Sequence, residues 1–369
     1  MKSHHVTPAG RTRARALRLP FPGEPGENNA ITDVEGVEVG VTTLISGEGK
    51  LIVGQGPVRT GVTAILPRGR KTNQIPCAAG YYSLNGNGEM TGTIWIEESG
   101  ELQTPITITN THSCGVARDA TIEWLVRHGG KNVQEWGLPV AAETFDGDLN
   151  DINGFHVKVE HVIQALEGAR GGPVEAGSVG GGTAMICYDF KGGNGTSSRV
   201  VTVAGRQYTV GAFVQSNFGQ RPECTILGVP VGLHLKGDEL RGKPQGSIIV
   251  IIATDAPLEA HQLKRLARRV PLGIARTGGI GHNSSGDIFL AFSTANAEAF
   301  AAPRGKLRRM EAIAIWDIDP LFVATIEATE EAIIDSMVAN QTMVGRDGNK
   351  SVALPHDRLI DVMRKYGRM

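Results

Sequence analysis

The apolar run from Ile248 to Ala253 constrains the fold of this chain more than any other segment. Five of its six residues are isoleucine or valine, and polar residues do not alternate with them. Such a run is typical of a strand that is covered on both faces. Layers of structure must therefore lie above and below it. A second run, Ile288 to Phe292, predicts another buried strand.

Strand-like and helix-like patterns follow one another in blocks along the rest of the chain. Period-two or β-rich runs predict strands at residues 37–41, 62–66, 94–97, 106–109, 185–190, 200–203 and 208–214, the last two as a hairpin around Gly205. Helical periodicity predicts helices at residues 113–128, 157–168, 257–270, 330–339 and 357–366. Because strands and helices segregate, the predicted class is α+β, with helices packed outside sheets.

Charge and cysteine content narrow the possible partners and compartments. The chain has 37 Lys and Arg residues against 38 Asp and Glu residues. This balance argues against nucleic acid and an anionic membrane, and it favours a small-molecule or peptide partner. No stretch approaches the roughly 20 apolar residues of a membrane span. The four cysteines are scattered without a CxxC pair, so we expect a reducing compartment.

The first 28 residues differ from the rest of the chain in their charge. Arg11, Arg13, Arg15 and Arg18 occur before the first acidic residue, Glu24. Such a segment can be a targeting signal, but no apolar region follows it. We interpret residues 1–28 as a solvated arm and residues 29–369 as a single domain.

Several common catalytic and binding motifs are absent from the sequence. It contains no GxSxG, HExxH, Walker A or EF-hand pattern. The glycine run at residues 180–182 lacks the Lys-Ser/Thr of a phosphate-binding loop. His156 and His161 are five residues apart, which is the wrong spacing for one helix face, and no carboxylate pair completes a metal site. We therefore read these histidines as surface or packing residues.

The Gly246-Ser247 step opens the apolar run and offers a different chemistry. If the bond between these residues were cut, Ser247 would carry both a hydroxyl and a free α-amine. An α-amine has a pKa of about 7.7–8.0, so part of it is neutral at physiological pH and can accept the hydroxyl proton. Gly246 leaves the backbone free to strain while the hydroxyl attacks its carbonyl. A Gly-Ser step by itself is more often a simple strand entry.

Two further segments carry candidate partners for this serine. Ser285 and Asp287 are two residues apart at the start of a predicted strand, so their side chains face the same way and the carboxylate can orient a second hydroxyl against the first. Asn217 ends a strand and is followed by Gly219, a position from which its amide can donate to a developing oxyanion. Both segments are also ordinary turn sequences.

Five segments, taken in their order and spacing, give the chain a recognisable pattern. It resembles the DmpA-type family, the L-aminopeptidase D-Ala-esterase/amidases and β-aminopeptidases, from about Asn29 to the C-terminus. The segments are NTHSCGVARDA, ETFDGDLNDING, GSVGGGTAMICYDFKGGNGTSSR, QGSIIVIIATDAPLEAHQLKRLARRVPLGIARTGG and SSGDIFLAFSTAN.

The resemblance implies a four-layer αββα sandwich, similar to N-terminal-nucleophile hydrolases but with different connectivity. It also implies a precursor that cuts itself into an α chain, residues 1–246, and a β chain, residues 247–369. Family members assemble as homotetramers of such pairs and need no cofactor or metal. Without the secretory segment of some relatives, we expect a cytoplasmic bacterial enzyme.

The family's functional residues carry over to single positions of this chain. The resemblance makes Ser247 the nucleophile of both self-cleavage and substrate turnover. It makes Ser285 and Asp287 the pair that orients and tunes this nucleophile, and Asn217 the oxyanion donor. Glu143 matches the glutamate that holds the free amino group of the substrate, a role suited to a carboxylate because it reads an ammonium directly.

One position departs from the family pattern. Relatives have tyrosine in an ETYDG sequence, and this chain has Phe145 instead. A hydroxyl that helps to stabilise the oxyanion is therefore missing, and such a donor is typically worth about 2.7–4 kcal/mol. Alternatively, Asn217 and a backbone N–H suffice, and Phe145 shapes an apolar substrate pocket.

The predicted activity is that of a self-processing serine aminopeptidase, amidase or esterase acting on short peptides, amides or esters. The sequence leaves open whether the residue released is an L-, D- or β-amino acid. One alternative is an acyltransferase similar to the ornithine acetyltransferases, although those typically expose threonine rather than serine. Another is an uncleaved binding protein that kept the fold without the activity.

Overall fold

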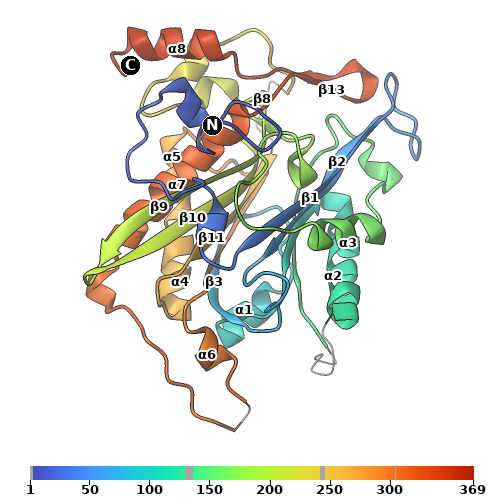
Figure 1. The fold of residues 1–369 in the computed structure, drawn as a ribbon. Coiled ribbons are helices and arrows are strands. Elements are labelled where there is room, and N and C mark those ends of the chain that lie inside the picture. Colours follow the sequence, from blue (N-terminus) through green and yellow to red (C-terminus); the bar gives the residue numbers. More distant parts are fainter. Residues whose placement is uncertain (1–2, 129–135, 242–245, 304) are drawn as a thin grey trace.

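Two β-sheets stack face to face in the computed structural model, which describes residues 3–128, 136–241, 246–303 and 305–369 (Figure 1). The larger sheet has the spatial order β4 (Glu101–Leu102), β3 (Cys77–Gly86), β12 (Ser285–Ser293), β11 (Gly246–Thr254), β10 (Arg206–Asn217) and β9 (Gly193–Val203). The smaller has the order β1 (Glu38–Ser46), β2 (Val58–Leu66), β5 (Ile106–Asn110) and β6 (Val140–Thr144). Neighbouring strands are antiparallel except for β11 with β12 and β5 with β6.

Helices cover the outer face of each sheet. The smaller sheet packs against α2 (Cys114–His128) and α3 (Val159–Glu167). The larger sheet packs against α4 (Ala260–Ala267) and α7 (Asp319–Val338), and α5 (Val270–Arg276) packs on α7. The order is therefore helix, sheet, sheet, helix, and it confirms the predicted four-layer αββα sandwich. The shorter elements are α1 (Thr93–Ser99), α6 (Ala297–Phe300), α8 (His356–Lys365), β7 (Ile186–Cys187), β8 (Phe190–Lys191), β13 (Met343–Val344) and β14 (Lys350–Ser351).

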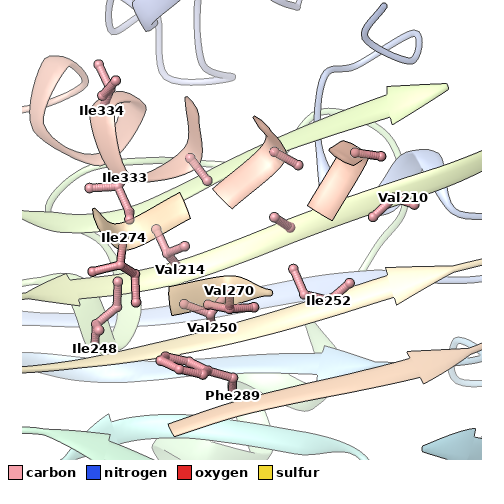
Figure 2. Packing of buried hydrophobic residues seen from close by; sticks show 14 of the residues in the cluster. Val210, Val214, Ile248, Val250, Ile252, Val270, Ile274, Phe289, Ile333 and Ile334 are labelled. Carbon is pink, nitrogen blue, oxygen red and sulfur yellow. The ribbon is translucent and has the colours of Figure 1, made fainter. Parts of the chain in front are cut away.

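Strand β11 lies in the middle of the larger sheet and is buried along its whole length. Its side chains alternate between two cores. Ile249 and Ile251 join the core between the sheets. Ile248, Val250 and Ile252 join the core under the outer helices, where Figure 2 shows them on the strand beside residues of α5 and α7. The unbroken apolar run is thus explained by burial on both faces.

Four predicted elements differ from the structure, and one of them is the helix predicted at 330–339, which begins already at Asp319 as part of α7. Residues 94–97, predicted as a strand, lie in helix α1, which begins after Gly92 (φ 75°) and ends at Gly100 (φ 71°). Four residues are too few to separate a period of 2 from a period of 3.6. The run at 185–190 is a tight hairpin, because Tyr188 and Asp189 both have positive φ. The helix predicted at 257–270 is shorter in the structure: α4 ends at Ala267, and a separate helix, α5, begins at Val270 with Pro271 in its first turn.

The interpretation of residues 1–28 as a solvated arm is wrong for much of the segment. The Arg13 side chain is 2% exposed and forms an ion pair with Asp335 of α7 at 2.8 Å. Arg15 pairs with Glu331, one helical turn away, at 2.7 Å. Leu19 and Phe21 are buried in the core under the outer helices. In the sequence these arginines look like an unpaired basic tail, because their acidic partners lie more than 300 residues away.

The glycine run at 180–182 has a packing role. The run forms a short 3₁₀ helix, and all three glycines are buried. A Cβ on Gly180, where φ is 53°, would lie 2.4 Å from Thr63 Oγ1. A Cβ on Gly181 would lie 2.2 Å from Gln215 Oε1. Glycine is thus required because this segment lies close against strands of both sheets.

The described residues add three findings on partners and compartment. Among them, no helix is long and apolar enough to cross a membrane. No group of three or more His, Cys, Asp or Glu side chains in these ranges is arranged to hold a metal ion. All four cysteines are buried and unpaired.

Candidate active site

Ser247 lies at the start of β11, at one end of the sheet. Its hydroxyl donates to the Gly246 carbonyl oxygen at 2.8 Å and accepts a long hydrogen bond from the Gly286 N–H at 3.4 Å. Gly246 has φ 144°, and a Cβ added there would lie 1.9 Å from the Asn217 carbonyl oxygen. Glycine is therefore the residue that fits before this serine, and the serine hydroxyl is held against the preceding peptide group.

Asn217 ends β10 and faces Ser247 directly in the antiparallel register. The side chain is fully buried. Its Oδ1 accepts from the Ile186 N–H at 2.9 Å, and its Nδ2 donates to the Phe145 carbonyl at 2.9 Å. An amide nitrogen carries two hydrogens, so this bond leaves Nδ2 a second donor. The structure thus brings together the predicted nucleophile and the predicted oxyanion donor.

Ser285 and Asp287 form the predicted pair at the start of β12. The Ser285 hydroxyl donates to Asp287 Oδ1 at 2.6 Å, and Asn85 Nδ2 donates to Asp287 Oδ2 at 3.0 Å. Burial raises the pKa of Asp287, although these two hydrogen bonds and one from the Ile248 N–H oppose the shift. The pair is therefore a buried carboxylate held by neutral donors.

The expectation that Ser285 aligns with the Ser247 hydroxyl is not met in the described residues, where no hydrogen bond joins these two hydroxyls. The parallel register explains this, because it pairs Ser285 with Gly246 and Asp287 with Ile248. Paired residues share a face of a sheet, and alternate residues lie on opposite faces. Ser285 therefore lies beside Gly246 and Asp287 beside Ile248, on the face of the sheet opposite the Ser247 side chain.

A small pocket lies on the face that carries this pair. Its lining includes Phe218, Ile274, His282, Ser285 and Asp287. His282 is half-buried, and its Nε2 lies 2.7 Å from Glu223 Oε1. The fold thus pairs His282 with a carboxylate that lies 59 residues away in the sequence.

Glu143 reaches the site from the other sheet, at the end of β6. Its carboxylate accepts from the Glu89 N–H at 3.0 Å and from the Thr111 hydroxyl. Burial raises the pKa of Glu143, and these two bonds oppose the shift. Gly88 lies between the two strands: a Cβ added there would be 3.1 Å from Glu143 Oε1 and 3.2 Å from the Gly286 Cα. Gly286 is the residue opposite Ser247, so the carboxylate is adjacent to the nucleophile's end of β11.

Phe145 contributes to the site through its backbone. Its carbonyl holds the Asn217 amide. Its ring packs on the following turn, since a Cβ added to Gly147 would lie 2.4 Å from Phe145 Cζ and 3.1 Å from Ile152 Cγ2. The para carbon, where tyrosine has its hydroxyl, therefore lies close to Gly147.

Sequence reasoning missed two side chains that hold the site residues. Asn85 donates to Asp287, and Arg241 donates to Asn217 Oδ1 at 2.8 Å. Asn85 opens an Asn-Gly-Asn-Gly sequence at the end of β3, and Arg241 lies in a stretch with no helical or strand pattern. Neither offers a local signal, because each contact joins segments far apart in sequence.

The arrangement has the parts that acyl transfer requires. It combines a hydroxyl at a carbonyl, an amide with a second donor at the same strand end, a carboxylate pair beside the adjacent backbone, and a carboxylate facing from the other sheet. Nucleophilic attack with stabilisation of an oxyanion uses such a set.

Comparison with known proteins gives concordant matches. A beta-peptidyl aminopeptidase BapA from Sphingosinicella microcystinivorans is 52% identical, over 97% of this chain and 93% of that protein. The structure of the L-aminopeptidase D-Ala-esterase/amidase from Ochrobactrum anthropi, described as a variant of the Ntn hydrolase fold, matches with a TM-score of 0.90 and 47% identity, over 96% of this chain and 99% of that one. A beta-aminopeptidase from Burkholderia sp. matches with a TM-score of 0.88 and 45% identity over the same shares.

The family model that matches the sequence covers residues 29–351, which is most of the chain. Its lower bound coincides with the position where the predicted resemblance begins. The resemblance is therefore confirmed, and the chain belongs to peptidase family S58.

Proposed function

We propose that this chain, a hydrolase of the serine aminopeptidase type, first cuts its own Gly246–Ser247 bond and then removes N-terminal residues from short peptides, amides or esters. The observation that carries the proposal is the Ser247 hydroxyl, 2.8 Å from the carbonyl oxygen of the glycine before it. The acyltransferase alternative is not favoured, because the matching family is a peptidase family.

In the first step, Ser247 Oγ attacks the Gly246 carbonyl carbon. A C–O bond forms, the C–N bond breaks, and the hydroxyl proton moves to the Ser247 nitrogen. Water then hydrolyses the resulting ester, which leaves a carboxylate on Gly246 and an amine on Ser247. Asn217 Nδ2 has a hydrogen to donate to the oxyanion that develops on the Gly246 oxygen.

In turnover, the new α-amine of Ser247 takes the proton from the Ser247 hydroxyl as it attacks the substrate carbonyl. The Ser285–Asp287 pair lies beside this amine, and its carboxylate stabilises the ammonium that forms. The leaving amine departs with the proton, and water hydrolyses the acyl-enzyme. Glu143 binds the substrate's own ammonium and so places the first residue of the peptide at the nucleophile.

The two products of self-cleavage remain associated because their strands are interleaved. In the larger sheet β11 and β12 belong to residues 247–369, and they lie between β10 and β3 of residues 1–246. Separating the chains would break two strand ladders and both cores. We also propose the tetramer of such pairs and the cytoplasmic location expected above, which light scattering and cell fractionation test.

For the substrate we propose peptides with an N-terminal β-amino acid. The 52% identical relative is named a beta-peptidyl aminopeptidase, and a solved relative is a beta-aminopeptidase. A β-amino acid places its ammonium one carbon further from the carbonyl, which suits a carboxylate that reaches in from the opposite sheet. Hydrolysis of β-alanyl, L-alanyl and D-alanyl p-nitroanilides should favour the β-alanyl compound, and a higher kcat/KM for L-alanyl would reject it.

A denaturing gel and N-terminal sequencing test the self-cleavage. The purified protein should give two fragments, residues 1–246 and 247–369, the smaller beginning Ser-Ile-Ile-Val. Ser247→Ala should remain a single chain without aminopeptidase activity. A Ser247→Ala protein that still divides at this bond would exclude the mechanism.

A further inference from the structure

Arg241 lies between the predicted oxyanion donor and the loop that follows β6. Its Nη2 donates to Asn217 Oδ1 at 2.8 Å, and its Nε donates to Asp148 Oδ2 at 2.6 Å. Its backbone N–H donates to Asp189 Oδ1 at 3.0 Å. The Arg241 side chain is 3% exposed, and that of Asp148 is 23% exposed. The guanidinium is therefore a buried charge with a fixed plane.

This contact decides which way the Asn217 amide points. An amide can be turned over so that its oxygen and nitrogen exchange places. Here the two groups that face Oδ1 are the Arg241 guanidinium and the Ile186 N–H, and both are donors only. A turned amide would place its NH₂ against two donors. The nitrogen is consequently held on the side of the Phe145 carbonyl, with its second hydrogen free of that bond.

We propose that Arg241 is a positioning residue for the oxyanion site, acting through Asn217 in a relay that runs from Asp148 to Arg241 to the Asn217 amide. The proposal rests on the function proposed above. A cation that binds the amide oxygen also draws electron density from the nitrogen, so the N–H becomes a stronger donor. The relay thereby orients and polarises the group that meets the developing negative charge.

The position of Arg241 in the chain extends this role to self-cleavage. Arg241 precedes the Gly246–Ser247 bond by five residues. Its partners Asp148, Asp189 and Asn217 all belong to residues 1–246. All three members of the relay are therefore present in the uncut chain and belong to the α chain after the cut, so one side chain can serve both reactions.

The test compares Arg241→Gln, Arg241→Lys and Asp148→Asn with the wild type. Self-cleavage is followed by gel after synchronised translation, and kcat and KM are measured on the cleaved fraction with β-alanyl p-nitroanilide. Loss of a whole oxyanion donor costs about 10²–10³ in kcat, so a misdirected donor in Arg241→Gln should cost about 10–100-fold in both rates. The KM should stay within about 2-fold, because Glu143 is unchanged.

Lysine keeps the charge without the planar fork, so Arg241→Lys should retain more kcat than Arg241→Gln. Asp148→Asn, at a more exposed position, should lose several-fold in kcat. Adding it to Arg241→Gln should cause little further loss, because both act through one relay. Affinity for a β-aminoalkyl boronate, which forms a tetrahedral adduct with the serine, should fall in parallel with kcat.

Arg13→Lys is the matched control. Arg13 is also a buried arginine that pairs with one aspartate, at 2.8 Å, but it lies in the N-terminal segment. This variant should lose stability and keep the wild-type kcat for cleaved protein. An equal kcat loss in Arg13→Lys, or wild-type kcat and boronate affinity in Arg241→Gln and Asp148→Asn, would overturn the proposal. If the wild-type protein remains uncut and shows no aminopeptidase activity, the proposed function itself is wrong.

Discussion

Two buried glutamates in this molecule have the same side chain and opposite electrostatic surroundings. Glu331 of α7 pairs with Arg15 at 2.7 Å and with Arg199 at 2.7 Å. Burial alone would raise the pKa of Glu331, but the two arginines outweigh it and the pKa lies below its usual range. Glu143 at the active site receives the Thr111 hydroxyl and a backbone N–H, and burial leaves its pKa raised.

The opposite pKa shifts distinguish a carboxylate whose charge stabilises the fold, Glu331, from one whose charge is available to bind a ligand, Glu143. Asp335 shows the intermediate case: burial raises its pKa although Arg13 opposes the shift. Asp287, whose side-chain partners Ser285 and Asn85 are neutral, resembles Glu143. Buried carboxylates without a cation cost stability, and they cluster where a positive group is to bind. At this site the cations that we propose are the substrate ammonium and the α-amine of Ser247.

The largest effect is expected from Glu331→Gln, which keeps the size of the side chain and removes its charge. Buried Arg199 and partly exposed Arg15 would lose their shared partner, and breaking a buried pair in this way costs about 3–5 kcal/mol. Denaturant unfolding in the Ser247→Ala background, where one uncut chain unfolds, measures the loss. The cleaved Glu331→Gln enzyme should keep the wild-type KM, and a stability within 1 kcal/mol of wild type, as an approximate threshold, would contradict the assignment.

The same substitution at Glu143 should act on binding. Glu143→Gln removes a charge-assisted hydrogen bond to the substrate ammonium, which is worth about 1.5–3 kcal/mol and corresponds to a KM higher by about 10–100-fold. Its stability should equal or exceed that of the wild type, because a buried charge without a cation is gone. Steady-state kinetics and unfolding on the same preparation check both. A wild-type KM would remove Glu143 from the substrate site.

The contributions of Glu331 and Glu143 to the stability of the fold should depend on pH with opposite signs. Because the pKa of Glu331 is lowered, its contribution to stability is present above the unfolded value of about 4.3 and is lost as the pH falls through the folded pKa. Because the pKa of Glu143 is raised, its ionised form costs stability above about 4.3, and that cost disappears on acidification. The stability differences of both glutamine variants from wild type should therefore shrink toward acidic pH, from opposite sides of zero.

The KM for the substrate should also depend on pH through Glu143. Protonation removes the charge that holds the ammonium, so KM should rise as the pH falls through the raised pKa of Glu143. A KM profile of the wild type against Glu143→Gln isolates this group. If both proteins show the same rise in KM, another group causes it.

The smallest effect is expected from Phe145→Tyr, which restores the family residue. The added hydroxyl would be attached to Cζ, which lies close to Gly147 on the turn after β6. The Asn217 amide bonds to the Phe145 backbone, which the substitution retains. The kcat should change by no more than about 3-fold, far less than the 10²–10³ of an oxyanion donor. A gain of 10-fold or more would show that the ring turns toward the nucleophile.

The sequence predicted the α+β class because that class follows from short-range patterns, whereas the four-layer αββα order was implied by the family resemblance. Branched residues in an unbroken run are buried on both faces of a sheet, and β11 shows this burial. The glycine before Ser247 is explained locally by its φ of 144°. The spacing of Ser285 and Asp287 placed both on one face of β12, where they hydrogen-bond. Each of these inferences needed only neighbours along the chain.

Other sequence predictions failed where distant contacts outweigh local pattern. The residues around Ile94 form a helix because glycines with positive φ bound it and only one side of it is covered. The basic N-terminal segment is folded onto α7 because acidic side chains of that helix neutralise it. Local composition contains no information on partners of this kind.

The sequence by itself determined the buried strand, the Gly246-Ser247 step and, through five spaced motifs, the peptidase family. Tertiary structure alone decided how the site is assembled. The strand register places Asn217 opposite Ser247 and moves Ser285 beside Gly246, and the stacking of two sheets brings Glu143 next to Gly286. Arg241 joins the site through a contact with Asn217, 24 residues away in the sequence. The physical reason is that periodicity reports which face of an element is buried, whereas register and sheet stacking depend on the packing of the whole chain.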